Sequence, residues 1–396
     1  MSWGSLTTVR ARVLCVVSAI WTIAFLVVIP LVLDGRVKGV PFQAYMAAGQ
    51  RWLEHAPLYD LTNIDGFQYL PQSAAFFSLL VRVGTPTADV LWRAMGWIGL
   101  ATGQWRLARR LLRERLEAGF VVATCLTALQ ACNALGNGQA NLMLAALCLH
   151  ATIALISQRF WSVAALLSLG LALKPLMLVP LLVVITLYPA TRWRTGLWMC
   201  AVALFPLIAR GVDYAIAQYD SCIVKLRMCA DPNRLFEDLA SMLASFGLRL
   251  SSAAYWGLRS VFALLVLCAC LLLRRRLPEP FATTSVMGLT LGYLMLFNPR
   301  TLSSSYVMVA AFAAPLAAAA MLHGAPRRAM VLGACVVAWN LNHHVFGFAQ
   351  HWLNPLACLV FCAELLCSKS FVREDAAELT CAGSCGPCMQ TSYKDS

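Results

Sequence analysis

Apolar runs of about 20 residues recur along almost the whole chain, and as helices each would cross roughly 30 Å of hydrocarbon. Of the 396 residues, 60% are hydrophobic and 12% are charged, with a mean hydropathy of +0.70. These values exclude a water-soluble globular domain. The sequence therefore predicts an all-α, polytopic bundle of transmembrane helices.

The formal net charge of +13 comes from short Lys and Arg clusters between the apolar runs, which indicates topology rather than nucleic-acid binding. When each cluster is placed in the cytoplasm, about twelve spans result and both termini are cytoplasmic. The expected spans are 12–33, 88–108, 118–135, 139–157, 160–174, 175–190, 195–212, 252–273, 280–297, 304–322, 328–345 and 352–367. We expect a multi-pass membrane protein, with an integral domain of residues 1–367 and a loose cytoplasmic tail of residues 368–396.

The segment Trp161–Ala190 can be read as one long crossing or as two short ones that meet at Lys174-Pro175. We expect two, because one crossing would place the later basic clusters outside. The map leaves two large external segments, 34–87 and 213–251. Within the first, the amphipathic stretch Phe42–Leu53 and the short apolar stretch Tyr69–Val83 are predicted to lie at the membrane interface.

Acidic and aromatic residues are interleaved in the first external segment. The acids include Asp34, Asp60 and Asp65, and the aromatic residues include Tyr45, Tyr59 and Tyr69. Carboxylates accept hydrogen bonds from sugar hydroxyls, and ring faces stack on sugar C–H bonds. An ordinary interfacial aromatic belt with solvated charges is the alternative interpretation.

Three elements of this segment resemble the first external loop of the family 87 glycosyltransferases. They are Phe42-Gln-Ala-Tyr45, Pro57-Leu-Tyr59-Asp60 and Phe67-Gln-Tyr69-Leu-Pro71. Later landmarks follow in the family's order: Gly138-Gln139-Ala-Asn141, Leu173-Lys174-Pro175 and Asn298-Pro299-Arg300. The family consists of GT-C-class membrane enzymes, which include polyprenyl-phosphate-mannose-dependent α-1,2-mannosyltransferases and arabinofuranosyltransferases.

The resemblance implies transfer of a mannose-like or arabinofuranose-like sugar from a polyprenyl-phosphate donor to an extracytoplasmic lipid or glycan acceptor. It also implies a location in a bacterial plasma membrane. A loop Asp would act as general base in an inverting displacement. The family pattern places an acidic residue just before Phe-x-x-Tyr, where this chain has Pro41. Asp34, Asp60 and Asp65 are therefore the candidate bases, and a catalytically inactive relative is an alternative.

Several later residues are candidates for substrate binding. Lys174, beside a helix-interrupting proline, and Arg300 could each hold the lipid phosphate. The amides of Gln139 and Asn141 could bind sugar hydroxyls at a helix start, although ordinary capping explains them equally well. His343 and His344 could line the same cavity near the last external turn.

Cys222 and Cys229 lie in an external segment and could form a disulfide in an oxidising compartment. No external cluster shows the spacing of metal ligands, so we expect no resident cofactor, although a divalent metal remains open. The main alternative function is a secondary transporter or lipid flippase with a broken helix at Lys174-Pro175. Such proteins usually show paired halves with matching interruptions, and this sequence shows none.

Overall fold

The computed structural model of the chain describes residues 3–35, 40–112, 116–229, 235–298, 300–345, 349 and 351–367. All regular secondary structure within these residues is helical, which confirms the predicted all-α class. The α-helices are α1 (Trp3–Leu33), α2 (Val40–Leu53), α3 (Pro71–Val81), α4 (Thr85–Leu111), α5 (Leu116–Asn137), α6 (Asn141–Ile156), α7 (Phe160–Leu173), α8 (Leu178–Leu187), α9 (Arg192–Arg210), α10 (Val212–Cys229), α11 (Leu239–Ser245), α12 (Ser252–Arg276), α13 (Phe281–Phe297), α14 (Val307–Leu322), α15 (Pro326–Val345) and α16 (Leu353–Leu366). Short 3-10 helices are η2 (Pro175–Met177), η3 (Pro189–Thr191) and η4 (Ser303–Tyr306).

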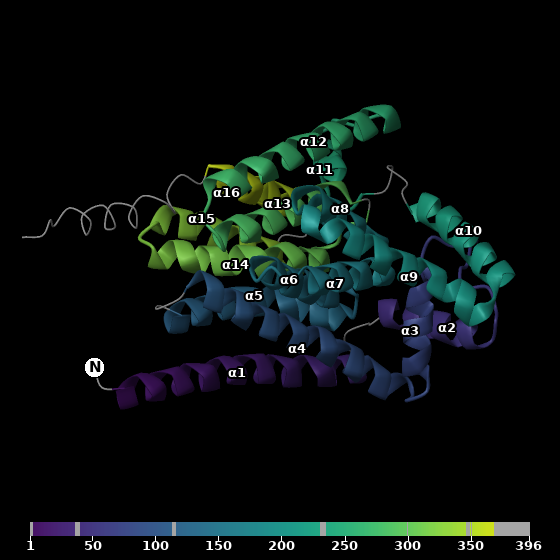
Figure 1. The fold of residues 1–396 in the computed structure, drawn as a ribbon, viewed down its shortest axis with the longest axis horizontal. Coiled ribbons are helices and arrows are strands. Elements are labelled where there is room, and N and C mark those ends of the chain that lie inside the picture. The colour runs from purple at the N-terminus through teal and green to yellow at the C-terminus, as the bar shows by residue number, and fades with distance from the viewer. Residues whose placement is uncertain are drawn as a thin grey trace, which may run out of the picture.

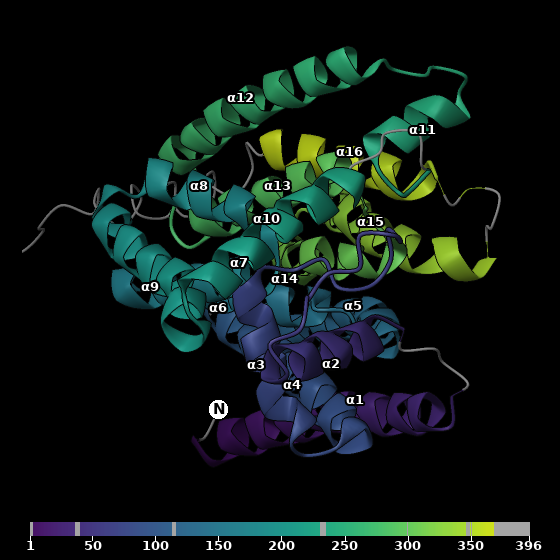
Figure 2. The same ribbon diagram turned by 90° about the vertical axis from the view of Figure 1, so that its right-hand side faces the viewer.

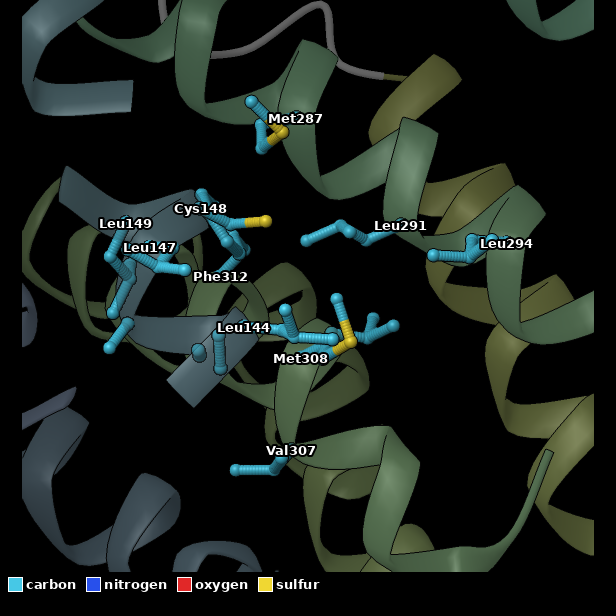
Figure 3. Packing of buried hydrophobic residues seen from close by; sticks show 14 of the residues in the cluster. Leu144, Leu147, Cys148, Leu149, Met287, Leu291, Leu294, Val307, Met308 and Phe312 are labelled. Carbon is cyan, nitrogen blue, oxygen red and sulfur yellow. The ribbon is translucent and has the colours of Figure 1, made fainter. Parts of the chain in front are cut away.

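The alanine-rich helix α14 forms the centre of the bundle. Every residue from Val307 to Ala320 is buried, and α14 packs against α4, α5, α6, α13 and α15. Small side chains allow this close approach, which is how helices associate where lipid removes the hydrophobic driving force. Figure 3 shows the apolar layer in which Cys148 of α6, Leu291 of α13 and Met308 of α14 lie near one another.

The outer helices direct apolar side chains away from the protein. In the most apolar stretch of α1 only 22% of the residues are buried, and in α12 only 17%, whereas the stretch that contains α14 is 89% buried. Helices with such exposed apolar surfaces are stable where lipid covers them. The chain is therefore an integral membrane protein.

Each of the twelve predicted spans coincides with a helix over most of its length. Among the described residues, four helices are long and apolar enough to cross a membrane: Ala11–Leu33, Glu117–Asn137, Ser252–Arg276 and Ser303–Leu322. A fifth span follows if Pro175–Leu187 and Pro189–Arg210, which are bent by 116°, count as one. Since α6, α7, α13 and α16 are apolar but shorter, the predicted count of about twelve crossings is not confirmed.

The predicted break at Lys174-Pro175 is present in the structure. Helix α7 ends at Leu173, and Lys174 has an extended backbone with φ −151° and ψ 125°. A residue that precedes proline is disfavoured in the α region, which explains why the helix stops there. Whether α7 and α8 make two crossings stays a prediction.

One end of the bundle is covered by helices from the two segments predicted to be external. Helices α2 and α3 correspond to the two predicted interfacial stretches, whereas the helical structure of α10 and α11 within 213–251 was not predicted. Figures 1 and 2 show α2, α3 and α10 together at the end of the bundle opposite the start of α1. These helices position the loop that carries two of the candidate bases.

Helices α2 and α3 touch each other through Gly49. A Cβ atom on Gly49 would lie 2.7 Å from the backbone carbon of Phe77 and 2.8 Å from the backbone nitrogen of Ser78. Because backbone atoms cannot rotate aside, Gly49→Ala is expected to destabilise the protein by about 1–3 kcal/mol. Thermal unfolding of the detergent-solubilised protein measures this effect.

The control for Gly49 is Gly257→Ala on α12, where an added Cβ would have nothing within 4 Å. We expect its melting temperature to equal or slightly exceed that of the wild type, because alanine favours helix. Equal melting temperatures for the two variants would contradict the close packing of α2 on α3.

The disulfide between Cys222 and Cys229, which the sequence left open, is not formed in the structure. Both thiols are free and buried on α10. Seven residues of helix separate two Cα atoms by about 10 Å, whereas a disulfide requires them within about 7 Å. Instead, Cys222 Sγ donates to the carbonyl of Tyr69 at 3.7 Å and Cys229 Sγ to that of Ile64 at 3.5 Å, so both thiols face the loop between α2 and α3.

Candidate active site

The loop between α2 and α3, residues 54–70, is fastened to α10 by Lys225. The side chain of Lys225 is fully buried, and its Nζ donates to the carbonyls of Asp60 at 2.7 Å, Asp65 at 2.8 Å and Asn63. An ammonium carries three protons, so all of its donors are used. Burial lowers the pKa of Lys225, and neighbouring groups that include the two aspartates oppose this shift. Lys225 thus fixes the course of the loop that contains Asp60 and Asp65.

The two loop aspartates have different environments. The exposed Asp60 accepts hydrogen bonds at Oδ1 from the Thr62 hydroxyl at 2.6 Å and the Thr62 N–H at 2.9 Å. These bonds lower the pKa of Asp60 because they favour the charged carboxylate. Asp65 Oδ1 instead accepts from Arg300 Nη2 at 3.0 Å, with 69% of the Asp65 side chain exposed. Asp65 is therefore the loop carboxylate that pairs with Arg300.

Arg300 follows the C-terminal end of α13 and connects it to the loop between α2 and α3. Its Nη1 donates to the carbonyl of Ile64 at 3.2 Å, and its guanidinium lies 5.7 Å from the centre of the Phe236 ring. The side chain is 26% exposed, so it retains access from outside. Pro299 of the Asn-Pro-Arg element lies outside the described residues.

Lys174 is a second half-buried cation near Arg300. From the break between α7 and η2, its Nζ donates to Asn141 Oδ1 at 2.9 Å and lies 5.8 Å from the centre of the Tyr69 ring. The charges of Lys174 and Arg300 are close enough to repel each other. Two cations with one neighbouring carboxylate form a site that favours a further anion. We call Lys174, Arg300, Asp65, Asn141 and Tyr69 the Lys174–Arg300 cluster.

The predicted amides stand at the start of α6. Asn141 is fully buried, and its Nδ2 donates to Gln139 Oε1 at 2.7 Å and to Ser305 Oγ at 3.0 Å. Asn141 therefore links Lys174 to the 3-10 helix η4. Gln139 is half-buried beside it.

Arg93 holds the turn that leads to Asn141. Its guanidinium pairs with Asp89 at 2.6 Å and donates to the carbonyls of Leu135 and Gly136, near the end of α5. Gly138 follows with φ +73°, and a Cβ there would lie 2.6 Å from Arg93 Nη2. Both its backbone conformation and the lack of space require glycine at this position.

The three predicted aromatic residues are mostly buried. Tyr45, Tyr59 and Tyr69 are 3%, 5% and 7% exposed. The hydroxyls of Tyr45 and Tyr69 bond to each other, the Tyr59 hydroxyl donates to the Tyr69 carbonyl at 2.6 Å, and Tyr45 stacks on Phe77. They pack the loop onto α2 and α3, and the suggested stacking of their rings on a sugar stays a prediction.

The remaining predicted residues are Asp34, His343 and His344. Asp34 is exposed at the end of α1, a helix that packs against α4 and α5. His343 and His344 belong to α15, but their side chains lie outside the described part of the structure. Asp34 and the two histidines therefore remain untested candidates.

Sequence reasoning missed Lys225, although the sequence of α10 contains a signal. The buried residues of α10 are Ala215, Gln218, Cys222, Lys225 and Cys229, which recur at the three- and four-residue spacing of one helical face. Gln218 shares the role of Lys225, since its Oε1 accepts from the Leu58 N–H at 2.8 Å. Polar residues within such a face indicate buried anchors.

No group of three or more His, Cys, Asp or Glu side chains within the described ranges could hold a metal ion. The expectation that the site has no resident cofactor stays a prediction. What the described residues do provide is an anion site next to a carboxylate.

Comparison with known proteins identifies the family to which this chain belongs. Residues 67–299 match the model of glycosyltransferase family 87, a range that contains Asn141, Lys174 and Lys225 and ends one residue before Arg300. A search of curated proteins found no match. The matched range covers more than half of the 396 residues. The chain therefore belongs to glycosyltransferase family 87, as its sequence motifs suggested, and it is a membrane glycosyltransferase that acts on a sugar donor and an acceptor.

Proposed function

We propose that this enzyme moves a mannose-like or arabinofuranose-like sugar from a polyprenyl-phosphate donor to an extracytoplasmic lipid or glycan. The observation that carries the proposal is that Arg300, which pairs with Asp65, is also within electrostatic range of Lys174, although the three residues come from separate parts of the chain. A donor phosphate supplies the anion that two cations favour. Arg300 can grip two phosphate oxygens through its planar guanidinium, and Lys174 adds a point charge.

Asp65 is the proposed general base. It takes the proton of the acceptor hydroxyl while that oxygen forms a bond to the anomeric carbon. The bond from this carbon to the donor phosphate oxygen breaks, and the phosphate leaves with the electron pair toward Lys174 and Arg300. Asp65 is favoured over Asp60 because Asp65 contacts Arg300 directly, whereas the Asp60 carboxylate is engaged by Thr62.

We also propose twelve crossings, with both termini in the cytoplasm and the cluster on the extracytoplasmic side. The agreement between predicted spans and helices supports this topology. Helices α6 and α7 have 16 and 14 residues, so each is about 21–24 Å long, less than the roughly 30 Å of hydrocarbon. Asn141 and Lys174 at their ends would then lie at a depth that a lipid phosphate can reach while its tail stays in the bilayer.

The test is sugar transfer in membranes that express the wild type, Asp65→Asn, Asp60→Asn or Asp34→Asn at matched levels. Radiolabelled polyprenyl-phosphate mannose and polyprenyl-phosphate arabinofuranose serve as donors. We expect Asp65→Asn alone to lower transfer by at least about 100-fold, the lower end of what general-base catalysis contributes. The other two variants should retain most of the wild-type rate.

Two other results would refute parts of this proposal. Loss of transfer in Asp60→Asn or Asp34→Asn alone would move the base to that residue and refute the assignment of Asp65. Absence of wild-type transfer with both donors would refute the proposed donor class and leave an inactive relative as the alternative.

A further inference from the structure

A groove with a volume of about 430 Å³ lies between α1, α4 and α5. Its lining is almost entirely apolar, and its largest side chains are Trp21, Phe25, Trp97, Trp105 and Phe120. The volume falls within the about 300–1,000 Å³ typical of ligand sites. None of these residues belongs to the Lys174–Arg300 cluster.

The shape of the groove suits a hydrocarbon chain. On α4 its lining runs from Ala94 to Trp105, a length of about 16 Å along the helix axis. On α1 it runs from Leu14 to Leu26, within the span Ala11–Leu33, whose most apolar stretch is only 22% buried. Lipid therefore surrounds the groove and can enter it from the side.

One end of the groove is basic. Arg109 follows Trp105 by four residues and so continues the groove-lining face of α4 by one turn. Its exposed guanidinium lies 5.9 Å from the centre of the Trp105 ring. An apolar groove that ends at an exposed guanidinium group is complementary to a phosphate with an attached acyl chain.

We propose that this groove binds an anionic phospholipid, with one acyl chain along Trp21 and Trp97 and its phosphate at Arg109. The glycosyl donor is not the occupant, because its phosphate is assigned to Lys174, at the opposite end of the bundle. The 27 residues of α4 extend about 40 Å, and Arg109 stands in the last turn, far from the α3 end. This site is independent of the proposed sugar-transfer reaction.

The test uses the full-length protein in detergent and lipids with brominated acyl chains, which quench nearby tryptophan fluorescence. Binding of brominated phosphatidylglycerol is compared with that of brominated phosphatidylcholine. We expect the wild type to bind the anionic lipid about fivefold more tightly, the effect of one arginine near a phosphate. Arg109→Gln should abolish this preference, and Ala101→Leu, which narrows the groove, should weaken binding of both lipids.

The matched control is Arg110→Gln. Arg110 is the next residue on α4, but its Nη2 donates to Ser157 Oγ at 3.0 Å, away from the groove. It should keep the wild-type preference. Equal binding of the two lipids by the wild type, or equal losses in the two arginine variants, would overturn the proposal. So would a raised KM for the glycosyl donor in Arg109→Gln, or a dimer that Ala101→Leu dissociates, because the groove would then hold the donor or a second copy of the chain.

Discussion

Lys174→Met is expected to lower kcat/KM for sugar transfer by about 100-fold, because one preorganised charge on the leaving phosphate contributes about that factor. The Lys174 Nζ is held by Asn141 Oδ1 at 2.9 Å, so its position is set before the donor binds. Methionine preserves the length of the side chain but removes the charge. The measurement is initial transfer rates over a range of donor concentrations.

Two further variants distinguish the loss of the Lys174 charge from an effect on folding. Lys174→Arg retains a cation and should recover part of the lost rate, while its planar group fits a different geometry. Arg210→Met removes a cation that lies over the Trp52 ring, outside the cluster, and should leave transfer unchanged. Equal rates for Lys174→Met and the wild type, with matched melting temperatures, would remove Lys174 from the site.

Lys225→Met is also expected to lower the rate of sugar transfer strongly. It acts on the site indirectly, because Lys225 holds the loop that carries Asp65. It would leave the carbonyls of Asp60, Asn63 and Asp65 without their shared donor. Each unsatisfied carbonyl costs about 1–3 kcal/mol when no water replaces the donor. The loop should lose its fixed course, and the resulting displacement of Asp65 should lower kcat by about 100-fold.

Donor binding distinguishes this positioning role from global unfolding. Lys174 does not depend on Lys225 for its hydrogen bond and should still hold the donor phosphate, whereas Arg300 is bonded to the displaced loop. KM for the donor should therefore change, but by less than kcat. Amide hydrogen exchange in residues 58–66 should rise, while exchange in α14 stays slow. The control is Arg227→Met, an exposed cation on the same helix. Unchanged exchange in the loop of Lys225→Met would show that the lysine does not hold it.

Much of the fold could be predicted because hydropathy and the positions of basic clusters can be read from short stretches of the sequence. They located most of the spanning helices within a few residues, and the proline rule located the break at Lys174. The count of crossings did not follow as firmly, because α6 and α7 are too short for length alone to show that they span. Helix α10 was missed because its polar residues resemble a loop when their spacing is ignored.

The candidate site could be predicted only in part. Lys174, Asn141 and Arg300 were identified individually from motifs, but the pairing of Arg300 with Asp65 joins residues 235 positions apart. No local pattern encodes such a contact. Whether Cys222 and Cys229 form a disulfide could not be decided from the sequence for a related reason, since their seven-residue separation permits pairing in a loop and forbids it on a helix.

A structure of the enzyme with a non-transferable polyprenyl-phosphate sugar analogue tests directly whether Lys174 and Arg300 hold the donor phosphate. We predict that the phosphate lies within about 3 Å of both Lys174 Nζ and an Arg300 guanidinium nitrogen, with the anomeric carbon on the side of Asp65. A phosphate bound elsewhere in the bundle, with Lys174 still bonded only to Asn141, would contradict the account.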